Sequence, residues 1–154
     1  MGAAKHGYNG DNAATFICGT CSPEVKRLVD TTRESLYKGI EAAVPGNRIG
    51  DIGNAVQTYC EERGYGVVRD FVGHGVGKKL HEEPSVPNFG HAGRGIRLSP
   101  GMTLAIEPMI NLGTYKVKQL SDGWTVKTAD GKLAAHFEHT IAITSNGPVI
   151  LTKV

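Results

Sequence analysis

Acidic and histidine side chains that interrupt apolar runs constrain this chain more than any other feature of its sequence. Glu107 lies within LAIEPM at residues 104–109, and Glu138 lies in a run of strand-forming residues at 136–143. His74 stands between glycines, and Asp11 follows a turn sequence. Burying an unpaired charge costs several kcal/mol or more, so carboxylates in such surroundings need a partner. The four residues therefore predict a cation site drawn from distant stretches of the chain.

Chain length and net charge limit the number of domains and the classes of partner to expect. A chain of 154 residues is long enough for one hydrophobic core and short for two, so we expect a single domain over residues 1–154. Seventeen basic and fifteen acidic residues give a net charge of +2 without a basic block, so we expect no nucleic-acid partner. No apolar stretch approaches the ~20 residues that span a bilayer, and a secretory signal is missing. We therefore expect a cytoplasmic protein with no membrane partner.

The three cysteines favour reduced thiols over a disulfide framework, because their number is odd and the chain carries no secretory signal. Cys18-Gly19-Thr20-Cys21 nevertheless forms a CxxC motif just before a helix start. Such motifs carry out disulfide exchange in redox proteins. A redox protein is therefore one alternative for the function.

Local signals predict a hairpin followed by two helices. Turn residues at 7–10 predict a hairpin over residues 2–18, with Asp11 opening its second strand and residues 13–18 forming a short strand. Ser22-Pro23-Glu24 is typical of a helix start, and apolar residues at helical spacing continue to Ala43, before Pro45-Gly46. Residues 49–60 predict a second helix that ends at Gly64.

The rest of the chain is typical of a mainly antiparallel sheet, which makes the expected fold class α+β. Short apolar runs predict strands at residues 67–68, 71–72, 102–110, 124–128, 137–144 and 149–151. Residues 82–100 contain three prolines and several glycines, so they predict a long loop. Loops of this length inside compact domains are usually functional.

Three carboxylates and one imidazole form a hard ligand set that suits Mn, Fe, Co or Zn. A carboxylate that bridges two such ions is typical of two-metal sites that activate water for peptide hydrolysis. Each residue also has a simpler interpretation. Glu107 could pair with a lysine, His74 and Asp11 could be turn residues, and Glu138 could lie on a solvent face.

Five sequence blocks narrow these alternatives. They are GHGVG at 73–77, LHEEP at 80–84, AIEP at 105–108, DGWTVKT at 122–128 and FEHT at 137–140. In this order they resemble the type I methionine aminopeptidases of the pita-bread metallopeptidase superfamily, over essentially the whole chain. The resemblance implies a pita-bread fold, with helices on the outer face of a curved sheet. It also implies a metal-dependent aminopeptidase that removes the N-terminal methionine of nascent proteins.

The resemblance also implies roles for individual residues. Asp11 and Glu138 would bridge two divalent ions (Co, Mn, Fe or Zn), and His74 and Glu107 would complete the first ion's ligands. His81 would contact the scissile peptide and stabilise developing charge. Glu107 or a bridging hydroxide would handle proton transfer and attack. Two further residues would line the methionine pocket, namely Trp124 and Leu80, although Leu80 stands where the family commonly has an aromatic residue.

One departure from the family pattern limits these expectations. The family's first ligating aspartate lies eleven positions before the second, which would place it one residue ahead of Met1. We therefore expect the C-terminal part of a pita-bread domain, with one well-formed metal site and reduced or absent activity. The C-terminal part alone would expose apolar surface that the rest of the domain covers. Such surface would favour self-association or a missing N-terminal fragment as partner. A non-catalytic pita-bread module that binds peptide or protein remains the main alternative.

Overall fold

The computed structural model describes residues 1–153 and contains two helices, α1 (Pro23–Ala42) and α2 (Ile49–Glu61). Ser22 caps α1, because its Oγ accepts a hydrogen bond from the Val25 amide at 3.3 Å, and Pro23 occupies the first turn. At the start of α2 the contact runs the other way, because the main-chain amide of the N-cap residue Arg48 donates to the Asp51 side chain at 2.7 Å. Both predicted helices are confirmed. Within the described chain, neither is long and apolar enough to cross a bilayer.

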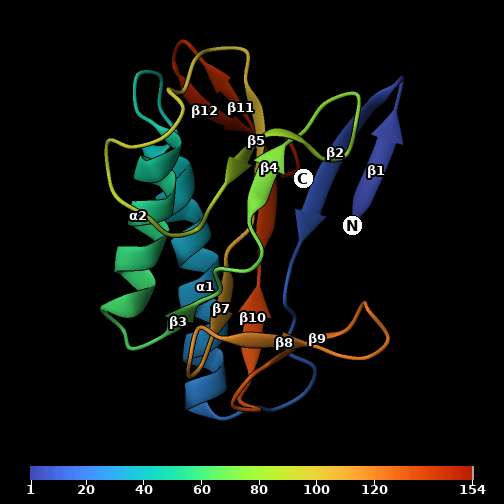
Figure 1. Cartoon of the computed structure of the whole chain (residues 1–154), viewed down its shortest axis with the longest axis vertical. Helices are drawn as coiled ribbons and strands as arrows, with labels where there is room; N and C mark the ends of the chain where they lie inside the picture. Colours follow the sequence, from blue (N-terminus) through green and yellow to red (C-terminus); the bar gives the residue numbers. More distant parts are fainter. Residues whose placement is uncertain (154) are drawn as a thin grey trace.

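Seven strands form the main sheet, and every neighbouring pair in it is antiparallel. Along the sheet they follow the order β1 (Gly2–Lys5), β2 (Tyr8–Ala13), β11 (Glu138–Thr144), β6 (Thr103–Ile106), β4 (Gly73–Gly75) and β5 (Glu82–Val86), with β12 (Gly147–Ile150) paired to β11. The two helices lie along one face of this sheet. The β1–β2 hairpin forms the edge of the sheet on the right of the molecule, away from the helices (Figure 1).

Two smaller sheets complete the architecture. One has the order β10 (Ala134–His136), β7 (Met109–Asn111) and β3 (Gly66–Val67), and the other pairs β8 (Val117–Gln119) with β9 (Val126–Thr128). The β8–β9 hairpin crosses the lower part of the molecule in front of β10 (Figure 1).

The core lies between the helices and one face of the main sheet. Alternate residues of β6 and β11 are fully buried there and join the apolar stripe of α1 in one cluster, which includes Leu104, Ile106, Ile141, Ile143, Leu28 and Leu36. Side chains alternate between the two faces of a strand, so the residues between these point to the opposite face. The α+β class with helices on one face of a mainly antiparallel sheet is therefore confirmed.

Three predicted strands and part of the predicted loop differ from the structure. The predicted strand at 13–18 is absent, because the second strand of the hairpin is β2, which ends at Ala13. Asp11 therefore lies inside this strand and does not open it. Residues 82–86 of the predicted loop form β5, which tolerates Pro84 because it is an edge strand with one unpaired side.

The predicted strand at 102–110 is split in two. It breaks at Glu107-Pro108 into β6 and β7, which belong to different sheets. Proline has no backbone N–H to donate to a ladder, so the chain changes sheets there. The predicted strand at 71–72 was also misplaced, because β4 begins at Gly73. The strands β8 and β10 were not predicted.

Candidate metal centre

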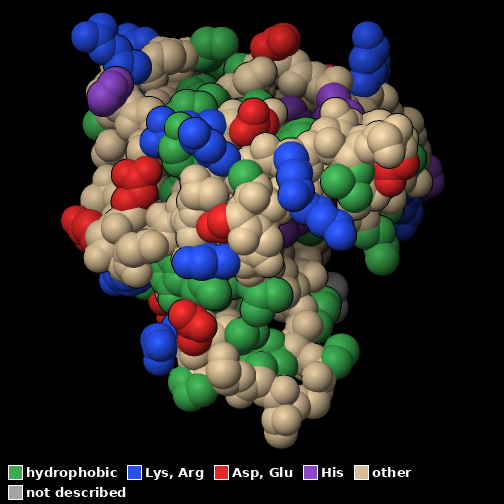
Figure 2. Space-filling model, turned by 60° about the horizontal axis from the view of Figure 1, so that its bottom comes forward, with side chains coloured by type: hydrophobic (Ala, Val, Ile, Leu, Met, Phe, Trp, Pro, Cys, Tyr) green, Lys and Arg blue, Asp and Glu red, His purple; other side chains and the backbone are tan. Residues whose placement is uncertain are grey.

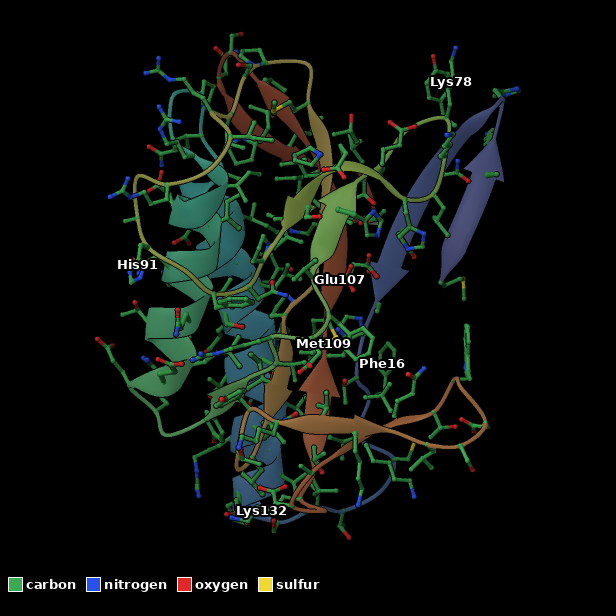
Figure 3. The ribbon with its side chains drawn as sticks, in the orientation of Figure 1. Phe16, Lys78, His91, Glu107, Met109 and Lys132 are labelled. Atoms are coloured by element: carbon green, nitrogen blue, oxygen red, sulfur yellow. The ribbon has the colours of Figure 1, made fainter. Side chains whose placement is uncertain are left out.

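Strand order and register bring the four predicted ligands to one place. The neighbouring strands β2, β11 and β6 carry Asp11, Glu138 and, one residue past the end of β6, Glu107, and the next strand, β4, carries His74. His139 pairs with Ile106, so the register sets Glu138 opposite Glu107. Figure 3 shows Glu107 near the centre of the molecule, beside the lower end of β4.

The same register puts the four side chains on the face that points away from the helices. Glu138 pairs with Ala13, which is two residues from Asp11, and His74 pairs with Ala105, which is two residues from Glu107. Directly opposed residues of an antiparallel pair share a face, as do residues two apart in a strand. Alternation along the strands therefore gives one face to the core and the other to this cluster.

Distances show that the cluster can hold an ion. Ligand atoms of His74, Glu107 and Glu138 lie within 4.8 Å of one another, and so do those of a second trio, Asp11, His74 and His81. His74 Nε2 lies 3.6 Å from Glu107 Oε1. The two trios share His74, so the described residues form one continuous centre.

A hydrogen bond on the side of the ring away from the centre fixes the orientation of His74. Its Nδ1 lies 2.8 Å from the Gly75 carbonyl, which can only accept, so Nδ1 carries the proton and Nε2 presents a lone pair to the centre. The glycines on either side of His74 allow β4 to lie this close to its neighbouring strands. A Cβ at Gly73 would lie 2.3 Å from the Ala105 carbonyl oxygen, and one at Gly75 would lie 2.2 Å from the Glu83 carbonyl oxygen. The histidine is thus held between β6 and β5 in a ligating orientation.

Electrostatics of the centre favour a cation. Burial, together with repulsion from Glu138 and Asp11, raises the pKa of Glu107 to about 8. Burial and repulsion from Asp11 raise the pKa of Glu138 to about 7. The Met1 ammonium, 3.5 Å from Asp11 Oδ1, offsets part of this repulsion. A divalent ion among these oxygens and the His74 nitrogen would relieve it further, so the residues present fit a metal.

The other predicted residues lie at different distances from this centre. The ring of His81 packs edge-on against His74, with centroids 4.3 Å apart, and is exposed on the open side of the centre. Leu80 lies beside Gly2 of β1, because its side chain would be 3.2 Å from a Cβ there. Trp124 belongs to neither trio and is 87% exposed, at the rim of a separate apolar cavity.

That cavity adjoins the metal centre. It has a volume of about 560 Å³, and its lining includes Phe71, Met109, Trp124 and His136. Met109 is two residues from Glu107, and His136 is two residues from Glu138. In Figure 3 Met109 lies just below Glu107. Sequence reasoning missed Met109 and His136, although each is two residues from a predicted ligand.

Two large aromatic side chains are exposed on the surface. Phe16 is 83% exposed and Trp124 is 87% exposed. Figure 2 shows hydrophobic side chains gathered in the lower half of the face that it presents, with charged groups around them. Large exposed aromatics of this kind are typical of surfaces that contact a ligand or another chain.

The two cysteines of the CxxC motif lie outside the centre. Cys18 and Cys21 are free and exposed in the connection between β2 and α1. A hairpin precedes this motif, where a thioredoxin-like order would need a strand and a helix. The redox alternative therefore has no support in the fold.

Comparison with known proteins gives concordant matches. The sequence model of metallopeptidase family M24 matches residues 1–145. The methionine aminopeptidase of Clostridium perfringens is 57% identical over 153 residues, which cover 99% of this chain and 61% of that protein. Methionine aminopeptidase 1 of Bacillus subtilis is 54% identical over 154 residues, which cover 100% of this chain and 62% of that protein.

Solved structures agree with these matches. The crystal structure of methionine aminopeptidase from Thermotoga maritima superposes with a TM-score of 0.97 at 51% identity, covering 99% of this chain and 61% of that one. The prolidase from Pyrococcus horikoshii superposes with a TM-score of 0.77 at 28% identity, and the match covers 99% of this chain and 38% of that one. The chain thus spans 61% to 62% of the length of the two curated relatives described above.

Proposed function

This chain belongs to metallopeptidase family M24 and has its pita-bread fold, and from that premise we propose that it is a metal-dependent aminopeptidase acting on N-terminal methionine. One observation carries the proposal: ligand atoms of His74, Glu107 and Glu138 converge within 4.8 Å on the sheet face opposite the core. Relatives named methionine aminopeptidase share more than half of its residues. The substrate is then the N-terminus of a peptide or a nascent protein.

We assign the metal ligands to His74, Glu107 and Glu138, with Asp11 beside them. When bound, a divalent ion lowers the pKa of a water ligand and polarises the peptide carbonyl. Because both trios share His74, we propose one tightly held ion per chain. The oxygen-rich ligand set suits Mn, Fe, Co or Zn.

The chain's own residues would then carry out the remaining steps. The Glu107 carboxylate lies within 4.8 Å of the ligand atoms of His74 and Glu138, so it is placed to accept a proton from the attacking water and return it. His81 lies against His74 on the open side, where its ring can hydrogen-bond the oxygen of the scissile peptide. The bond between His74 Nδ1 and the Gly75 carbonyl keeps the Nε2 atom of His74 directed at the centre.

The apolar cavity beside the centre suits a methionine side chain. Ligand pockets typically have volumes of ~300–1,000 Å³ and mostly apolar walls, and this cavity has a volume of about 560 Å³. Met109 forms its wall nearest to Glu107, and Trp124 forms its rim. A flexible thioether side chain packs well against methionine and aromatic groups. Nascent chains as substrates imply a cytoplasmic protein.

The test measures metal content and turnover on the same sample. Purified protein is incubated with Mn²⁺ or Co²⁺ and a Met-Ala-Ser peptide, and released methionine is quantified. We expect release that depends on metal and is lost in Glu138→Gln. Metal binding without turnover would overturn the aminopeptidase and favour a non-catalytic peptide-binding module. Folded protein that binds no metal would overturn the metal centre itself.

A further inference from the structure

Asn88 lies just past β5 and is fully buried, with 0% of its surface exposed. Its side-chain Nδ2 donates a hydrogen bond to the main-chain carbonyl of Glu107 at 3.1 Å. Its Oδ1 is also buried but has no hydrogen-bond partner among the described residues. Among the described residues, the Asn88 side chain therefore makes one polar contact, and this contact is with the main chain of a proposed metal ligand.

The backbone at Glu107 needs such a contact because it lies between two strands. β6 ends at Ile106 and β7 begins at Met109 in another sheet, so neither strand ladder includes Glu107 or Pro108. The Pro108 carbonyl is held by His136, whose Nδ1 lies at 3.2 Å, and by the Phe137 amide at 3.4 Å. The Glu107 carbonyl is held by Asn88. Two side chains, Asn88 and His136, and the Phe137 amide thus replace the ladder at the point where the carboxylate enters the centre.

The position of Asn88 in the sheet explains how it reaches this carbonyl. β4 lies between β5 and β6, and its first residue, Gly73, pairs with Val86 of β5. Asn88 lies two residues beyond Val86, past the point where β4 begins. It therefore bridges from the β5 side directly to the chain that leaves β6.

The buried Oδ1 of Asn88 does not account for an asparagine at this position. A buried polar atom without a partner is destabilising, and an apolar side chain of the same size would avoid this at Oδ1. An apolar side chain could not donate a hydrogen bond to the main-chain carbonyl of Glu107. The N–H group of the amide is therefore the part that the site uses.

We propose that Asn88 is a positioning residue of the metal centre, which orients Glu107 by holding its main-chain carbonyl. The inference rests on the proposed function only in taking Glu107 as a metal ligand. Groups that orient metal ligands from behind commonly change metal affinity by ~10–100-fold when they are removed. Asn88 would act in this way through the backbone of the ligand.

Asn111 provides a matched control. It is 1% exposed, its Nδ2 donates to a main-chain carbonyl, that of Thr114, at 2.8 Å, and its Oδ1 likewise has no partner among the described residues. Thr114 is not a proposed ligand. Asn111 lines the apolar cavity beside the centre, so the comparison uses Co²⁺ binding, to which the cavity contributes no proposed ligand, and not turnover. Asn88→Leu and Asn111→Leu therefore remove the same chemistry at equal burial, but one bond ends at the metal centre and the other does not.

The experiment titrates Co²⁺ into metal-free wild type, Asn88→Leu and Asn111→Leu, following the visible absorption of bound Co²⁺ and the heat of binding. Thermal unfolding of each protein without metal records the loss of stability. We expect Asn88→Leu to bind Co²⁺ at least ~10-fold more weakly, with an altered spectrum. Asn111→Leu should keep the wild-type affinity and spectrum. Asn88→Ala serves as a second variant if leucine disturbs the packing.

Each outcome decides the matter. Wild-type affinity and spectrum in a folded Asn88 variant would overturn the inference and leave the proposed function standing. An equal loss of Co²⁺ binding in the Asn111 variant would also overturn it, because a general loss of order would then explain both. Wild-type protein that binds no Co²⁺ would overturn the proposed function, and this inference with it.

Discussion

Glu107→Gln should remove a pH-dependent loss of stability from the metal-free protein. Burial and repulsion from Glu138 and Asp11 raise the pKa of Glu107 from 4.5 to about 8. The folded protein therefore binds this proton more tightly than the unfolded chain does. Stability from this group is fully present below pH ~4.5 and is lost as the pH rises through about 8, because the ionised form is favoured in the unfolded chain.

The size of the effect follows from the shift. At 1.36 kcal/mol per pKa unit, a shift from 4.5 to about 8 corresponds to ~5 kcal/mol. The Glu107 side chain is 16% exposed, and Glu138 shares the repulsion, so solvent screening lowers the expected loss to ~3 kcal/mol between pH 5 and pH 9. Glutamine has nearly the same shape and cannot ionise, so the variant should lack this loss.

The assay is urea unfolding of metal-free wild type and Glu107→Gln at pH 5, 7 and 9. The stability difference between the two proteins should grow with pH in favour of the variant. Glu62→Gln, which removes an exposed carboxylate at the end of α2, controls for the loss of one charge. Mn²⁺ at 100 times its Kd should stabilise wild type by ~2.7 kcal/mol and should stabilise the variant far less. Parallel pH curves for wild type and Glu107→Gln would refute the argument that these carboxylates are buried together.

Three further predictions follow from the same geometry. Metal analysis of protein equilibrated with excess Mn²⁺ and desalted should find one ion per chain, since His74 is shared by both trios, and two stoichiometric ions would contradict this. Gly73→Ala should destabilise the protein by ~2–4 kcal/mol in urea unfolding, because its Cβ would lie 2.3 Å from the Ala105 carbonyl oxygen; a change below ~0.5 kcal/mol would argue against the close packing of β4 and β6. Met109→Ala should raise KM for methionyl peptides several-fold while Co²⁺ affinity stays unchanged, and an unchanged KM would remove the cavity from the substrate site.

Local chemistry made the helices predictable. Ser22, Pro23 and a periodic apolar stripe define α1 within a few residues of sequence, so no distant contact was needed to find it. The predicted strand at 13–18 shows where local patterns fail. Its apolar residues Phe16 and Ile17 are exposed, because β2 separates from β11 after the pair Ala13 and Glu138. Strand formers alone do not make a strand without a neighbour to pair with.

The break at Glu107-Pro108 shows a similar limit. Residues 102–110 form a continuous apolar run in the sequence, yet they divide between two sheets. Proline explains why a break occurs, but the sequence does not say which partner each half finds. In the same way, Pro84 suggested a loop, and only the edge position of β5 made a strand compatible with it.

The sequence by itself predicted which side chains could bind a metal, because charged groups set among apolar neighbours and glycines need a partner wherever they are buried. Tertiary structure decided that they meet. The strand order β2, β11, β6, β4 carries Asp11, Glu138, Glu107 and His74 to one face, and a shift of one residue in register would turn a ligand toward the core. Asn88 could be recognised only in the structure, because its importance lies in one hydrogen bond to a carbonyl that is distant in sequence.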